Sequence, residues 1–198
     1  VVSALLVVEP DLGSAVVIVA ASVVLLFIGG AQLRYFLLLL LVAGGLLALL
    51  IWMEPYRMQR FMAFIDPWAM PFDGGYQLVQ ALIAFGRGEL FGLGLGEGIQ
   101  KLYYLPEAHN DFIFAVIAEE LGAVGALILL AVYSLFIIQI FSVARAQLEQ
   151  EELFAGYCCY FVGLIFAFQL LINLGVNTGA LPTKGLTLPF LSLIHISE

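Results

Sequence analysis

Asp111 is the residue whose type and position best suit acid–base chemistry. It is the last carboxylate before a long apolar stretch that begins at Phe112. A carboxylate at such a boundary is partly removed from water, and there it can take a proton from a substrate hydroxyl as a general base. Aspartate is also a preferred residue immediately before a helix, so capping of the following helix is the structural alternative. The residues alone leave both roles open.

Two further carboxylates, Glu119 and Glu120, lie inside the same apolar stretch. An ionisable residue at membrane depth is expensive and usually functional. In a helix, Glu119 would lie about 80° around the axis from Asp111, and Glu120 would lie on the face opposite Asp111. At most one of the two glutamates can therefore share a cavity with Asp111. The simpler interpretation is that one glutamate pairs with a basic residue of the preceding loop.

Most of the basic residues flank the apolar stretches of the chain. The planar guanidinium of arginine and the compact ammonium of lysine both bind phosphate, so these cations suit a lipid with an anionic headgroup. Anchoring at the membrane interface explains any single one of them equally well. The cations in question are Arg57, Arg60, Arg87, Lys101 and Lys184.

The composition indicates the surroundings in which these residues act. Apolar residues make up 63% of the chain and charged residues 11%, and the mean hydropathy is +1.08. Soluble domains contain roughly 25% charged residues, so the surplus apolar surface must face lipid. The net charge of −8 excludes a nucleic-acid partner, which requires basic patches. The sequence therefore predicts an all-α integral membrane protein.

Four apolar stretches are long enough to cross a bilayer as helices. They are residues 12–30, 35–53, 112–144 and 153–174. Each of the first two would form a helix about 28 Å long, close to the ~30 Å hydrocarbon core. The third stretch is too long for one straight crossing, so we expect a bend or break near Gly122 and Gly125. The predicted fold is a polytopic helix bundle.

The connections between these stretches alternate between two faces. The links at 31–34 and 145–152 share one face, and the loop at 54–111 and the Gly/Pro-rich segment at 175–192 share the other. Within the large loop, residues 76–85 have the pattern of one short amphipathic helix. The basic residues do not fix the orientation, because most of them belong to a long loop, where the positive-inside rule weakens.

Several polar motifs follow one another along the chain. The densest covers residues 100–114, which read Gln-Lys-Leu-Tyr-Tyr-Leu-Pro-Glu-Ala-His-Asn-Asp-Phe-Ile-Phe. The others are Glu9-Pro-Asp-Leu-Gly13, Tyr56-Arg-Met-Gln-Arg60, Asp66-Pro-Trp68, Gly75-Tyr-Gln77, Gly86-Arg-Gly-Glu-Leu-Phe-Gly92, Glu119-Glu-Leu-Gly122, Asn177-Thr-Gly179 and Leu181-Pro-Thr-Lys-Gly-Leu-Thr-Leu-Pro-Phe-Leu-Ser192. In this order they resemble the SEDS family (shape, elongation, division, sporulation) of membrane glycosyltransferases, and most of all its cell-division member.

The resemblance implies a bundle of ten transmembrane helices, of which we expect this chain to hold about four as an internal fragment. Residues 1–192 would form one transmembrane domain fragment, with residues 54–111 as a large periplasmic loop. Residues 193–198 depart from the family pattern and are predicted to be non-native. The implied location is the bacterial inner membrane, crossed several times, at the division septum.

The resemblance also implies a reaction, the polymerisation of lipid II into glycan strands of peptidoglycan. This is an inverting glycosyl transfer from an undecaprenyl-pyrophosphate-linked donor, and Asp111 matches the family's essential aspartate, the predicted catalytic base. The identity of any metal ligand is left open, although a divalent cation such as Mg²⁺ or Mn²⁺ would suit the departing pyrophosphate. The predicted substrate-binding residues are Lys184, Arg60, Arg87, Lys101, Gln77, His109 and Glu119.

The implied partners are a class B penicillin-binding transpeptidase, other division proteins and membrane lipid. Two other functions stay open beside the polymerase, namely a lipid II flippase and a non-catalytic division scaffold. Asp111 discriminates among the three. A polymerase needs a base at the periplasmic face, a flippase needs only a polar path, and a scaffold should tolerate loss of the carboxylate.

Overall fold

All regular elements in the described part of the chain are helices. The chain forms two compact units, residues 1–53 with 133–168 and residues 54–132 with 169–198. The long helices α6 (Ile113–Glu149) and α7 (Leu153–Asn177) contribute to both units. The computed structural model describes residues 12–53, 58, 62–69, 75–106, 108–182 and 185–191.

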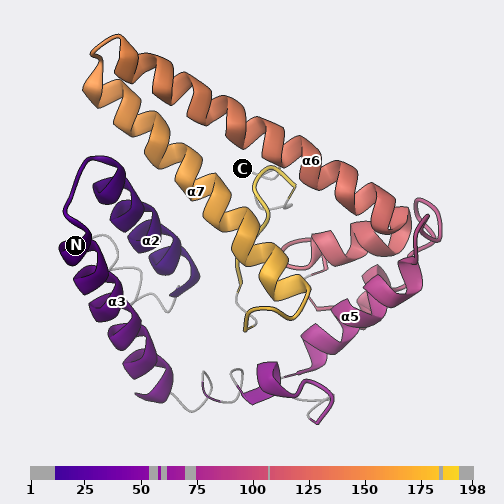
Figure 1. The fold of residues 1–198 in the computed structure, drawn as a ribbon. Coiled ribbons are helices and arrows are strands. Elements are labelled where there is room, and N and C mark those ends of the chain that lie inside the picture. Colours follow the sequence, from indigo (N-terminus) through magenta and orange to yellow (C-terminus); the bar gives the residue numbers. More distant parts are fainter. Residues whose placement is uncertain are drawn as a thin grey trace. The chain divides into compact units, whose positions relative to one another are not determined.

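The first unit begins with an antiparallel pair of apolar helices, α2 (Leu12–Ile28) and α3 (Leu33–Met53), which lie side by side (Figure 1). Gly30 closes the turn between them at φ +91°, a left-handed conformation that favours glycine. The rings of Phe27 and Phe36 pack across the turn with centroids 4.9 Å apart. The apolar stretches at 12–30 and 35–53 are helical as expected, and the second helix begins two residues earlier than the predicted stretch.

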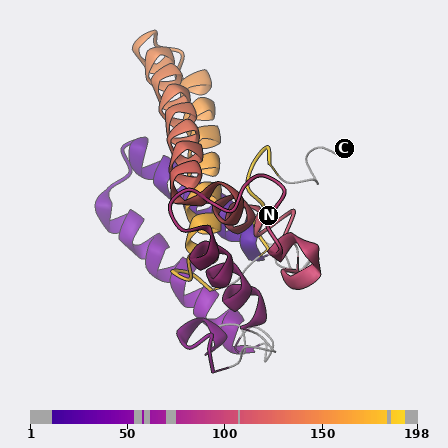
Figure 2. The same ribbon diagram turned by 90° about the vertical axis from the view of Figure 1, so that its right-hand side faces the viewer.

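The other part of the first unit is a hairpin made by the end of α6 and the start of α7, which run side by side (Figure 1, Figure 2). Aromatic rings join the two helices. Phe136 meets Phe166 edge to face at 5.6 Å, and Phe141 stacks on Tyr160 at 5.8 Å. Gly163 leaves room for the Phe141 ring, since a Cβ there would lie 2.6 Å from a ring carbon.

The link predicted at 145–152 is wrong in its first half, because α6 continues as a helix to Glu149. The residues after Arg145 include Ala, Gln, Leu and Glu, all strong helix formers. Arg145 Nε also donates to Glu149 Oε1 at 2.9 Å, the spacing that supports an exposed helix. Only residues 150–152 connect the two helices.

The second unit is built from α5 (Tyr76–Gly88), the π-helix η1 (Gln100–Tyr104), the first part of α6 and the end of α7. The predicted amphipathic helix at 76–85 is confirmed and extends to Gly88. Its alanines, Ala81 and Ala84, are fully buried in a core with Phe112 and Val176. Small side chains on α5 allow the neighbouring backbones to approach closely.

The break predicted in the third apolar stretch is confirmed at Gly122, which has φ +69° and ψ −172° inside α6. The loop after α5 supplies hydrogen-bond partners around the break. Leu93 N donates to Glu119 O at 3.1 Å, and Ala123 N donates to Glu89 O at 3.0 Å. Backbone groups that a broken helix would leave unpaired are thereby satisfied.

Two of the described helices, α6 and α7, are long and apolar enough to cross a membrane. The described apolar parts of α2 and α3 are shorter. Four spans, a single domain over residues 1–192 and a periplasmic loop at 54–111 therefore stay predictions. The prediction about residues 193–198 lies outside the described residues.

Candidate active site

Asp111 lies in a turn immediately before α6 and is half-buried. The neighbouring Phe112 side chain is 2% exposed and anchors the turn in the core. The Phe112 carbonyl accepts from the amides of Ala115 and Val116 at 3.0 and 3.3 Å, which starts the helix. The carboxylate therefore stands on a fixed stretch of backbone where the loop meets an apolar helix.

A pair of buried asparagines on α7, Asn173 and Asn177, holds this stretch of backbone. Asn173 Nδ2 donates to Asp111 O at 2.9 Å, and Asn177 Nδ2 donates to the same carbonyl oxygen at 3.0 Å. Asn177 Oδ1 accepts from Ala115 N at 3.2 Å. The two side chains are 1% and 0% exposed. One of the first amides of α6 is thus bound by a side chain of α7.

The same amide pair also holds the chain that follows α7. Asn173 Nδ2 donates to Leu186 O at 2.7 Å. Gly185 lies against the acid, because a Cβ at this position would be 3.1 Å from Asp111 Oδ2. Three pieces of chain meet here, namely the start of α6, the end of α7 and the segment around Gly185. They place one carboxylate on a rigid support.

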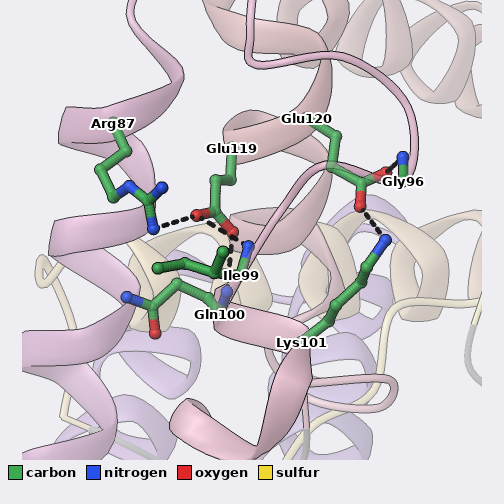
Figure 3. Close-up of polar contacts among 7 residues, drawn as sticks. All are labelled: Arg87, Gly96, Ile99, Gln100, Lys101, Glu119 and Glu120. Atoms are coloured by element: carbon green, nitrogen blue, oxygen red, sulfur yellow. Dashed lines mark hydrogen bonds and ion pairs between the residues drawn. The ribbon is translucent and has the colours of Figure 1, made fainter.

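A second polar cluster surrounds Glu119, whose side chain is fully buried (Figure 3). Its Oε1 lies 3.1 Å from Arg87 Nη1 of α5, and the Arg87 side chain is 34% exposed. The amides of Ile99 and Gln100 donate to the same carboxylate at 3.4 and 3.1 Å. Glu119 therefore fastens both α5 and the start of η1 to α6.

Glu120 points to the other side of the loop (Figure 3). Lys101 Nζ donates to Glu120 Oε1 at 2.6 Å, and Gly96 N donates to Oε2 at 3.1 Å. The interpretation that a glutamate pairs with a base of the loop is confirmed, and it holds for both glutamates. The two ion pairs give Arg87 and Lys101 a role within the fold.

Of the predicted site residues, the structure brings Arg87, Lys101 and Glu119 into this one cluster, whereas Asp111 belongs to the asparagine network. Gln77 is half-buried on α5, and His109 is exposed on the turn before Asp111. Contacts of these residues with substrate stay predictions. Two predicted substrate-binding residues, Arg60 and Lys184, lie outside the described residues.

Within the described residues, no three His, Cys, Asp or Glu side chains gather closely enough to hold a metal ion. The described side chains alone therefore do not form a metal site, and no step below depends on one. The divalent cation stays a prediction.

Asn173, Asn177 and Gly185 are not among the site residues predicted from the sequence. A signal for the asparagines was present, because they lie four residues apart in an apolar stretch and so share one helix face. Buried amides must find hydrogen-bond partners, which makes such a pair a sign of a tertiary contact. Gly185 carried no comparable signal.

These features define a helical membrane protein with a carboxylate supported at the start of a long apolar helix. The chain belongs to the FtsW/RodA/SpoVE family of cell cycle proteins, whose family model matches residues 1–193. This confirms the SEDS resemblance of the sequence motifs.

Named relatives support the same assignment. The chain is 54% identical over 188 residues to the probable peptidoglycan glycosyltransferase FtsW of Nitrosococcus halophilus, covering 95% of this chain and 49% of the relative. It is 54% identical over 192 residues to the protein of that name from Legionella pneumophila, covering 97% and 49%. The chain spans about half the length of the curated relatives that it matches.

A solved structure also resembles this fold. It is described as "Structural coordination of polymerization and crosslinking by a peptidoglycan synthase complex". The TM-score is 0.70 at 30% sequence identity, and the match covers 96% of this chain and 52% of the other. The likeness extends over both compact units of the chain.

Proposed function

We propose that this chain carries the catalytic part of a peptidoglycan glycosyltransferase that polymerises lipid II during septal cell-wall synthesis. The observation that carries the proposal is the support of Asp111, whose backbone carbonyl accepts from both Asn173 and Asn177. A general base must be held in a fixed geometry to act on one hydroxyl proton. The relatives named peptidoglycan glycosyltransferase support the choice of reaction.

The proposed chemistry is an inverting displacement at the anomeric carbon of the lipid-linked donor strand. The 4-hydroxyl oxygen of the N-acetylglucosamine of lipid II forms the new bond to that carbon, and its proton passes to the Asp111 carboxylate. The bond from the anomeric carbon to the pyrophosphate oxygen breaks. Undecaprenyl pyrophosphate leaves with the bonding electrons, and its negative charge requires nearby cations.

The predicted cations divide into two groups in this proposal. Arg87 and Lys101 are ion-paired with Glu119 and Glu120, so they contribute mainly by holding the loop in place. Lys184 is the better candidate for the departing pyrophosphate, because it directly precedes Gly185, which lies against the Asp111 carboxylate. A lysine ammonium binds phosphate as a point charge.

We further propose that α2, α3, α6 and α7 all cross the bacterial inner membrane. The 17 residues of α2 and 21 residues of α3 give lengths of about 26 and 32 Å, near the ~30 Å of the hydrocarbon core. In α6, the residues between Gly122 and Arg145 span about 33 Å. The first turns of α6 and the loop before it would then lie at the periplasmic surface.

The proposed partner is a class B penicillin-binding transpeptidase that cross-links the new strands. The similar solved structure is described as a complex that coordinates polymerisation with cross-linking. Coupling of the two reactions would require this chain to meet such a partner in the membrane.

The test uses a chimaera in which the 192 matched residues of this chain replace their counterpart in the Legionella pneumophila relative, reconstituted in liposomes with its transpeptidase. Labelled lipid II is supplied, and both glycan strands and transbilayer movement of lipid II are measured. Strand formation that is lost in Asp111→Asn supports the polymerase. Lipid II transport by both variants, without any strands, contradicts it and favours a flippase. Absence of both activities favours a scaffold.

A further inference from the structure

The amides of Asn173 and Asn177 point in a direction that their partners determine. The acceptors Asp111 O, Leu186 O and Asn173 O are carbonyl oxygens and cannot donate, so they must face Nδ2 groups. The Ala115 amide can only donate, so it must face Asn177 Oδ1. No alternative orientation of the two side-chain amides satisfies all of these partners.

The network acts on the backbone that carries Asp111 from two sides. Asp111 O receives two N–H groups, at 2.9 and 3.0 Å, and this fixes the peptide plane that follows the acid. Four residues after Asp111, the Ala115 amide is fixed by the same Asn177 side chain. Asn177 Nδ2 also lies 2.9 Å from Asn173 O and 3.1 Å from Asn173 Oδ1, and these two acceptors share one of its two N–H groups, so the two asparagines hold each other. A buried network with each member satisfied keeps one geometry.

The network also controls the distance between the acid and its neighbour across the site. Asn173 fixes Leu186 O at 2.7 Å, and Leu186 follows Gly185 in the chain. A Cβ on Gly185 would lie 3.1 Å from Asp111 Oδ2, so the gap there leaves little room for displacement. Loss of Asn173 would release both sides of this gap, whereas loss of Asn177 would release the side that carries Asp111.

We propose that Asn173 and Asn177 are positioning residues that hold the Asp111 carboxylate at the hydroxyl from which it takes a proton. This inference rests on the proposed function, because it assumes that Asp111 is the base. The asparagines act through Asp111 without touching the substrate. Their loss should therefore lower the rate of the chemical step and leave lipid II binding nearly unchanged.

The experiment measures kcat and KM for lipid II polymerisation by the reconstituted chimaera carrying Asn177→Ala or Asn173→Ala. We expect kcat to fall about tenfold to a hundredfold, as for a misplaced catalytic group, with KM changed by less than about twofold. Thr178→Ala is the matched control, because Thr178 is exposed and its hydroxyl donates to Leu174 O of its own helix. It should keep the wild-type kcat.

Gly185→Ala is a second variant that displaces the carboxylate without removing an amide, so it serves if the asparagine variants do not fold. It should lower kcat with KM unchanged. Wild-type kcat in every folded variant, while Asp111→Asn is inactive, would overturn the positioning role and leave the proposed reaction standing. Full activity of Asp111→Asn would instead remove the proposed base, and the inference with it.

Discussion

Substitution of the buried Glu119 should lower the stability of the second unit more than most other single substitutions there. In Glu119→Gln the volume is kept, but one carboxylate oxygen becomes an NH₂ group. That group must face either Arg87 Nη1 or the Gln100 amide, both of which are donors lying 3.1 Å from the carboxylate. One donor is left facing another donor whichever way the amide turns.

The magnitude follows from the burial of each partner. Removal of one member of a buried ion pair costs about 3–5 kcal/mol, and the 34% exposure of Arg87 reduces this to about 2–3 kcal/mol. A buried amide without an acceptor adds about 1–3 kcal/mol. We therefore expect Glu119→Gln to destabilise the docking of the loop by about 4 kcal/mol. For Glu120→Gln we expect about 1–2 kcal/mol, because the Glu120 side chain is 13% exposed, so water can reach this site, whereas the Glu119 side chain is fully buried.

The assay is amide hydrogen exchange of the purified protein in detergent, read at Ile99 and Gln100. A loss of about 4 kcal/mol corresponds to a roughly thousandfold drop in protection, whereas Glu120→Gln should cause only about a tenfold drop. Equal exchange at these amides in the two variants would refute the reasoning, because it would mean that the fully buried carboxylate of Glu119 holds the loop no more tightly than the partly exposed carboxylate of Glu120.

Two further predictions concern glycines of α5 and the exposed end of α6. Gly88→Ala should prevent α5 from docking, since the new Cβ would overlap the Ala118 carbonyl, whereas Gly86→Ala, with open space around it, should stabilise the helix by about 0.5–1 kcal/mol. Thermal melting of the two variants in detergent checks this, and equal melting temperatures would contradict it. Arg145→Ala removes an exposed pair with Glu149 and should change the melting temperature very little, because such pairs contribute about 0.3–0.5 kcal/mol. A large drop would show that this helix end has a further partner.

The helices could be predicted from the sequence because long apolar runs leave few alternatives. The break at Gly122 was predictable for the same reason, since the apolar stretch around it exceeds one membrane crossing. The continuation of α6 to Glu149 is not visible in the apolar pattern, because the residues from Arg145 onward are mostly polar. Polarity ends the contact with lipid, but helix propensity decides where the helix ends.

The site was predictable only in part. Asp111 could be selected from its position at the loop boundary, and a glutamate–base pair could be expected from charge alone. The asparagine network could not, because hydrogen bonds between residues 62 and 66 positions apart depend on how α7 packs against the start of α6. The π-helix η1 could not be predicted either. The amides at its start donate to the Glu119 carboxylate, which lies 19 or 20 positions further along the chain.

The most direct test of the central claim is the rate of glycan-strand extension by the reconstituted chimaera carrying Asp111→Asn. Glu97→Gln is the matched control, because Glu97 is an exposed acid of the same loop and the same charge is removed. If Asp111 is the general base, its variant should lose about 10²–10⁴-fold in kcat, and Glu97→Gln should keep the wild-type rate. Strand extension by a folded Asp111→Asn protein at the wild-type rate would contradict the account.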